Sequence, residues 1–190
     1  MHKGRLEAFS DGVIAIIITI MVLEFKVPHS TDLSSLLELF PIFLSYVLSF
    51  VYVGIYWNNH HHLLQVTTKI HGGILWANLH LLFWLSLIPF STAWMGENHF
   101  ADGPVAVYGV ILFMCAIAYT ILQNSLIKHH GHDSTLAKAI GSDTKGKISL
   151  VCYVVGGLIS HYAPLVSLAL YVFVALLWLV PDRRIEHLVN

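Results

Sequence analysis

The sequence predicts an all-α, polytopic membrane protein. Of its 190 residues, 56% are hydrophobic and only 11% are charged, and the mean hydropathy is +0.71. Soluble domains carry about 25% charged residues, so this composition is typical of a chain surrounded by lipid. Long apolar runs alternate with short polar segments, as expected of helices that cross a bilayer several times. The net charge of −1 and the lack of a basic tract exclude nucleic acid as a partner and leave the lipid bilayer as the expected surroundings.

The apolar runs predict six transmembrane helices in a single domain over residues 1–190. The last run, from Ile148 to Val180, contains no Asp, Glu, Lys or Arg and is too long for one tilted helix. A glycine pair at 156–157 and a polar segment at 161–164, which ends in a proline, divide it into two helices. The expected spans are about 8–27, 39–59, 73–95, 105–127, 148–161 and 164–180.

The first of these helices is an unusual membrane span. Its charge-free stretch between Asp11 and Glu24 covers about 18 Å, against a hydrocarbon core of roughly 30 Å. At least one ionisable group of this helix is therefore expected near membrane depth, where such groups face protein or water rather than lipid. A helical wheel places one charge, one glycine, one hydroxyl and several large apolar side chains on a common face. The residues of this face are Arg5, Phe9, Gly12, Ile16, Thr19, Ile20 and Leu23.

The start of this helix resembles the signature of a known channel family. Arg-x-x-x-Phe-Ser-Asp over residues 5–11 is similar to the motif of the lysosomal/endosomal potassium channel family (the transmembrane protein 175 family), in its prokaryotic branch. Trp-x-Asn-His at 57–60 and Pro-Phe-Ser at 89–91, near the ends of the second and third helices, also look like family features. The residues expected to form the structural motif are Arg5, Phe9, Ser10, Asp11, Trp57, Asn58 and His60.

The resemblance implies a modestly potassium-selective cation channel, not an enzyme. Animal members have two such repeats per chain, so a single repeat implies a homotetramer around one pore lined by the first helix. The positions that match the narrowest part of that pore are Ile16, Ile20 and Leu23, with Thr19 beside them. A hydrophobic ring strips water from a passing ion and so favours the weakly hydrated potassium ion. No carbonyl filter of the TVGYG type is present. Potassium is the permeant species, and no cofactor is implied.

The positive residues predict how the chain lies in the cell membrane. With the N-terminus inside, nine of the ten Lys and Arg residues fall on the cytoplasmic side and only Lys26 falls outside. Both termini of this multi-pass protein are therefore expected in the cytoplasm. The start of the first helix and the end of the second then share one side, where Trp57, Asn58 and His60 can donate hydrogen bonds to Asp11.

Two other functions stay open on the residues alone. A secondary transporter or proton-coupled carrier would use Arg5, Asp11 and His80 as a substrate or proton path. A metal-dependent membrane enzyme would use the histidines at 60–62 together with those at 129, 130 and 132. Consecutive histidines point in different directions on a helix and do not chelate one ion together, so no metal site is predicted. The two cysteines lie in apolar runs and are expected to be small core residues.

Overall fold

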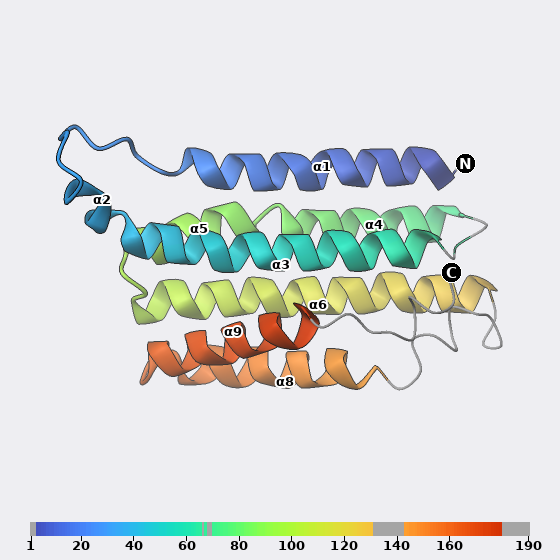
Figure 1. Ribbon diagram of the computed structural model, residues 1–190. Helices are drawn as coiled ribbons and strands as arrows, with labels where there is room; N and C mark the ends of the chain where they lie inside the picture. The colour runs from blue at the N-terminus through green and yellow to red at the C-terminus, as the bar shows by residue number, and fades with distance from the viewer. Residues whose placement is uncertain (1–2, 66, 68–69, 131–142, 180–190) are drawn as a thin grey trace.

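The computed structural model describes residues 3–65, 67, 70–130 and 143–179, and these form a bundle of roughly antiparallel helices (Figure 1). The described residues contain no strand, so the predicted all-α class is confirmed. The chain passes from one end of the bundle to the other with each long element. The helices are α1 (Lys3–Leu23), α2 (Ser35–Glu38), α3 (Phe40–Gln65), α4 (Gly72–Leu85), α5 (Ile88–Glu97), α6 (Asp102–His130), α8 (Thr144–Ile159) and α9 (Pro164–Leu179).

Four helical segments are long and apolar enough to cross a membrane: 3–23, 40–65, 72–97 and 102–130. At 1.5 Å per residue, the shortest of them covers about 31 Å, which matches the hydrocarbon core. The helices α8 and α9 have 16 residues each and cover about 24 Å. The expectation that these two also span the membrane stays a prediction.

Helix α1 begins and ends earlier than predicted, at Lys3 and Leu23 instead of residues 8 and 27. The chain leaves the helix because Phe25 packs against α3, with its ring 5.3 Å from Tyr46 and 6.5 Å from Phe43 between centroids. Lys26 then reaches α5 and makes a 2.6 Å ion pair with Glu97. The short helix α2, which the sequence did not predict, follows in the connection to α3.

The third expected span consists of two helices. Pro89 has no backbone N–H and cannot bond to the carbonyl of Leu85, so α4 ends there and α5 begins after a two-residue turn. The break itself lies against neighbouring helices, since Leu85, Ile88 and Pro89 are all buried. The break therefore leaves these three side chains buried, although Phe83 and Phe90 beside it are exposed.

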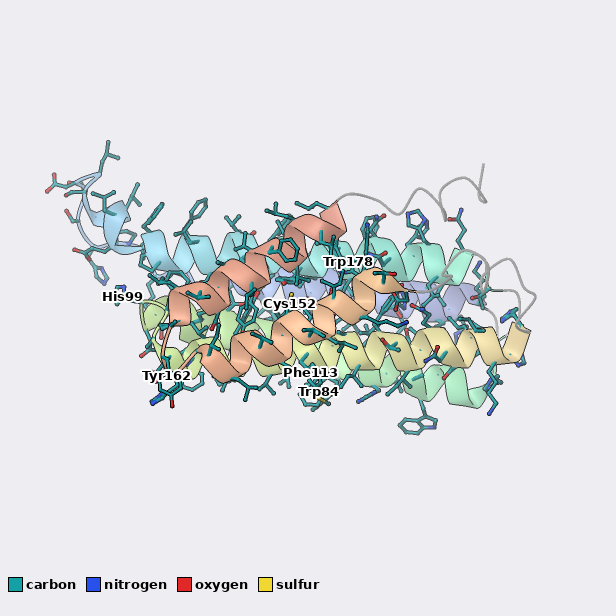
Figure 2. All side chains as sticks on the ribbon, turned by 90° about the horizontal axis from the view of Figure 1, so that it is seen from below. Trp84, His99, Phe113, Cys152, Tyr162 and Trp178 are labelled. Atoms are coloured by element: carbon teal, nitrogen blue, oxygen red, sulfur yellow. The ribbon has the colours of Figure 1, made fainter. Side chains whose placement is uncertain are left out.

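Helix α6 lies at the centre of the bundle and contacts α4, α5, α8 and α9 (Figure 1). Its contact with α8 and α9 is organised by Tyr171, which is fully buried and donates to the carbonyl of Val105 at 3.4 Å. The ring lies against Gly109 of α6 and Gly156 of α8, where a Cβ atom would collide with it. In Figure 2, which is seen from below, α8 and α9 lie on the near side of the bundle and are joined by the turn that holds Tyr162. On the opposite side of the bundle, α1 packs on α3, α4 and α5.

Candidate pore-lining face and its supporting polar network

Helix α1 has a buried face that attaches it to the rest of the subunit. Its buried residues recur at helical spacing, so one stripe meets α3, α4 and α5. The stripe is apolar except for one hydroxyl near its start. Its members are Leu6, Ser10, Ile14, Ile17 and Met21.

The other face of α1 carries large apolar side chains that no part of the described chain covers. Ile16 is 59% exposed, Ile20 42% and Leu23 74%, whereas the neighbouring Ile17 is only 3% exposed. Thr19 is also exposed, and its hydroxyl donates to the carbonyl of residue 15 at 2.8 Å. The structure thus places the four predicted pore residues together on one outward-facing stripe. Phe9, 54% exposed, and Gly12 continue the stripe toward the start of the helix.

A groove of about 630 Å³ runs along this stripe between α1 and α5. Ile16 and Ile20 line its apolar part together with Trp94 of α5, and Glu24 and Glu97 stand at its other end. Beyond the membrane-spanning segment, the hydrogen bond from Lys26 to Glu97 raises the pKa of the Lys26 ammonium above its usual value. This pairing holds the Lys26 ammonium at a carboxylate at that end of the groove.

A buried hydrogen-bonded network contacts the buried face of α1. Ser10, Asn78 and His60 are 0%, 0% and 2% exposed. The Asn78 Nδ2 donates to Ser10 Oγ at 3.0 Å, and Ser10 Oγ donates to the carbonyl of Leu6 at 2.8 Å. The His60 Nε2 lies 2.7 Å from Asn78 Oδ1, which can only accept, so this ring nitrogen carries the proton. The network joins α1, α4 and α3 by buried polar contacts.

Of the three donors predicted for Asp11, Trp57 makes the hydrogen bond and His60 does not. The indole Nε1 of Trp57 donates to Asp11 Oδ1 at 3.0 Å, as its placement on α3 allowed. His60, predicted as another donor, instead turns inward to Asn78, and Asn58 is exposed. His60 therefore does not donate to Asp11, because the buried Asn78 offers it an acceptor.

Asn78 is the site residue that sequence reasoning missed. It stands in the apolar run 74–79, where a lone amide is costly unless it is hydrogen-bonded, and that isolation was the available signal.

The start of α1 also approaches the end of α3, since Lys3 Nζ donates to the carbonyl of Gln65 at 3.0 Å. Lys3 further pairs with Glu7 at 3.7 Å, while the Arg5 side chain is exposed.

The residues of the carrier alternative do not converge. His80 accepts a 3.0 Å hydrogen bond from Trp84 Nε1 one turn later on α4, so its partner lies in its own helix and not across a helix boundary. It stands two residues from Asn78, about 200° around the helix, and so faces away from the side that meets Ser10 of α1. This placement gives no path from Asp11 to His80.

The metal alternative also finds no support in the described part of the chain. No group of three or more His, Cys, Asp or Glu side chains is arranged there to hold a metal ion. The ring of His129 lies 4.6 Å from that of His71, and His61 stacks on Trp57. His132, a member of the second predicted cluster, lies outside the described residues.

The fold and this face define a multi-pass helical membrane protein whose first helix turns an apolar stripe outward. The family model described as endosomal/lysosomal potassium channel TMEM175 matches residues 5–89, which include α1, α3, α4 and the network between them. A protein named potassium channel from Chryseobacterium sp. (strain P1-3) is 59% identical over 186 residues, which cover 98% of this chain and 97% of that protein. The chain belongs to the TMEM175 family.

A further sequence match and a structural match come from Chamaesiphon minutus. A protein named potassium channel from strain PCC 6605 is 37% identical over 137 residues, which cover 67% of this chain and 66% of that protein. The crystal structure of a lysosomal potassium-selective channel TMEM175 homolog from this organism superimposes with a TM-score of 0.83 at 30% identity. That match covers 95% of this chain and 97% of the other. The resemblance of the 5–11 motif to this family is confirmed.

Proposed function

We propose that this protein conducts potassium ions through a central pore lined by α1 of four identical subunits. The observation that carries the proposal is the outward stripe of Ile16, Thr19, Ile20 and Leu23 on a helix anchored by buried polar contacts. Four such stripes around an axis would enclose a narrow apolar constriction. The named activity of the relatives, potassium channel, agrees with this reading.

The constriction selects by the cost of dehydration. It offers no ring of carbonyl oxygens to replace the hydration shell of an ion, since every residue of the stripe lies in a continuous helix. An ion must therefore lose part of its water against isoleucine and leucine side chains. Potassium holds its water less strongly than sodium, so modest selectivity for potassium follows.

Asp11 and Arg5 have a structural role in this proposal. Trp57 holds the Asp11 carboxylate at the same end of the bundle where Lys3 meets the end of α3. With both termini cytoplasmic, as the lysine and arginine distribution favours, this end lies at the inner mouth of the pore in the cell membrane. The Asp11 carboxylate helps to fix α1 there, and neither Asp11 nor the exposed Arg5 coordinates the ion.

Ion flux across liposome membranes tests the function. Purified protein in liposomes with an outward potassium gradient should give a potassium flux that follows the gradient alone, with a smaller flux when sodium replaces potassium. A flux that saturates and needs a coupled ion would instead indicate a carrier. Cross-linking in mild detergent should stop at four subunits, and saturation at two would remove the single-pore arrangement.

Thiol accessibility tests the lining. Single cysteines at positions 16, 20 and 23 should react with water-soluble thiol reagents in the assembled protein, whereas a cysteine at 17, which is buried against the subunit, should not. Equal reactivity at 16 and 17 would show that the stripe does not line a water-filled path.

A further inference from the structure

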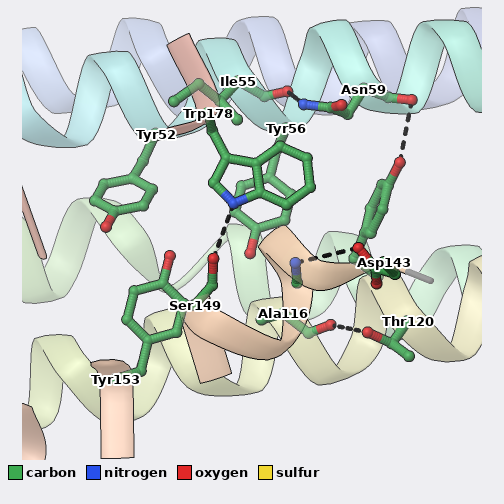
Figure 3. A pocket seen from close by; sticks show the side chains of 12 residues that line it. Tyr52, Ile55, Tyr56, Asn59, Ala116, Thr120, Asp143, Ser149, Tyr153 and Trp178 are labelled. Atoms are coloured by element: carbon green, nitrogen blue, oxygen red, sulfur yellow. Dashed lines mark hydrogen bonds between the residues drawn. The ribbon is translucent and has the colours of Figure 1, made fainter. Parts of the chain in front are cut away.

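A second cavity, of about 40 Å³, lies between α3, α6, α8 and α9, and none of the residues lining it belongs to α1. It has room for about three water molecules, or for the head of a small organic cation. Its walls are aromatic, as Figure 3 shows. The rings come from all four helices and belong to Tyr52, Tyr56, Tyr119, Tyr153 and Trp178.

The cavity lies at a step in the bundle. Helices α3 and α6 have 26 and 29 residues, whereas α8 and α9 have 16 each. The shorter pair therefore covers only part of the length of the longer pair, and the last turns of α3 and α6 extend beyond them (Figure 1). Asp143, the N-cap of α8, and Trp178, near the end of α9, line the cavity from this step.

Several hydrogen-bond donors of the wall are already used within the chain. Trp178 Nε1 donates to Ser149 Oγ at 2.9 Å, and the Tyr119 hydroxyl donates to the carbonyl of Asn59 at 3.3 Å. The Thr120 hydroxyl donates to a carbonyl one turn earlier on α6 at 2.9 Å. These bonds hold the side chains in place, and aromatic rings and hydroxyl groups line the cavity around them (Figure 3). Such a wall suits a positively charged guest better than an anion.

The charge of the wall points the same way. Asp143 is the only side chain with a full charge at neutral pH among the described residues that line the cavity, and its Oδ1 caps α8 by accepting from Gly146 N at 3.1 Å. The Trp178 indole already attracts one cation, since Lys145 Nζ lies 5.8 Å from its ring centroid. Lys145 itself is not among the lining residues.

We propose that this cavity binds a small organic monocation of the alkylammonium or quaternary ammonium class, held by cation–π contacts with the tyrosine and tryptophan rings and by the Asp143 carboxylate. An inorganic ion fits less well, because most of the wall is ring carbon, and hard cations require a shell of oxygen ligands. The site is separate from the α1 stripe, so its occupation does not depend on the proposed pore.

Binding of choline to the purified full chain tests this site, with 3,3-dimethyl-1-butanol as a neutral probe of the same shape. Titration calorimetry or saturation-transfer NMR in maltoside micelles avoids competing choline headgroups. We expect saturable choline binding in the millimolar range, at least 10-fold tighter than binding of the neutral alcohol. Equal affinity for the two probes, or no saturation by choline, would overturn the proposal.

Two variants locate the site. Asp143→Asn keeps an efficient N-cap for α8 and removes only the charge, and it should weaken choline binding at least 5-fold while leaving the neutral probe unchanged. Asp102→Asn, which removes a carboxylate outside the cavity, should bind choline like the parent. Unchanged choline binding by Asp143→Asn, or an equal loss in Asp102→Asn, would place the cation elsewhere.

Two variants of Tyr119 test the site independently if the Asp143 variant does not fold. Tyr119→Phe retains the ring and should retain choline binding, whereas Tyr119→Leu should lose at least 3-fold in affinity because the ring is gone. Equal binding by these two variants would contradict the cation–π assignment. The readout is ligand binding, so a failure to conduct potassium leaves the outcome unaffected.

Discussion

Replacing Asn78 with alanine should destabilise the subunit by separating α1 from α3 and α4. Asn78 is fully buried and makes two side-chain hydrogen bonds, one of 2.7 Å to His60 and one of 3.0 Å to Ser10. The substitution removes both bonds. Ser10 keeps its bond to the Leu6 carbonyl, but the His60 ring N–H loses its acceptor at a position that is 2% exposed.

The expected loss follows from these two bonds. Hydrogen bonds between membrane helices contribute about 0.6–1.7 kcal/mol each, because the unfolded helices also find partners in the membrane. Two of them sum to about 1–3 kcal/mol, and the buried N–H of His60 places the expected value at about 2–3 kcal/mol. For a chain of this size each kcal/mol lowers the melting temperature by about 2–4 °C, so the expected decrease is about 4–12 °C.

Thermal unfolding in detergent, followed by tryptophan fluorescence, measures this loss. Asn124→Ala is a matched control, since Asn124 is an exposed amide on α6 and its removal should shift the free energy of unfolding by less than about 0.5 kcal/mol. If Asn78→Ala melts within about 1 °C of the parent, or no lower than Asn124→Ala, the network does not hold α1 in place. A double-mutant cycle with Ser10→Ala should show coupling, because both side chains belong to one bond.

Three further predictions test the stripe, the helix packing and the Asp11 contact. Ile16→Asn should hydrate the constriction, raise potassium flux in liposomes and lower its ratio to sodium flux, whereas Ile17→Asn, 3% exposed in the parent, should mainly lower the melting temperature. Gly156→Ala, whose Cβ would lie 2.6 Å from a buried tyrosine ring on α9, should cost about 1–2 kcal/mol, while Gly157→Ala, with open space around it, should gain about 0.5–1 kcal/mol, so equal melting temperatures would contradict this packing. Asp11→Ala should lower both the yield of the proposed tetramer in mild detergent and the melting temperature. A variant that assembles and melts like the parent but selects differently would show that Asp11 acts on the ion.

The sequence by itself determined the class of the protein and the two faces of α1. Lipid-facing composition, charge-free runs and turn residues located the long helices to within a few residues at most ends. Helical periodicity separated Ile16 from Ile17, because adjacent residues stand 100° apart on a helix and cannot share a face. The 5–11 motif indicated the family from the sequence alone, without the structure.

Only the tertiary structure decided which polar groups meet. The bond between Ser10 and Asn78 joins residues 68 positions apart, and the one between His60 and Asn78 joins residues 18 apart. Local pattern carries no information about such pairs, because each depends on the relative depth and rotation of two helices. The early end of α1 has the same origin, since Phe25 leaves the helix to pack on α3. The aromatic cavity at Trp178 also has no sequence signature, because its rings come from four helices that only packing brings together.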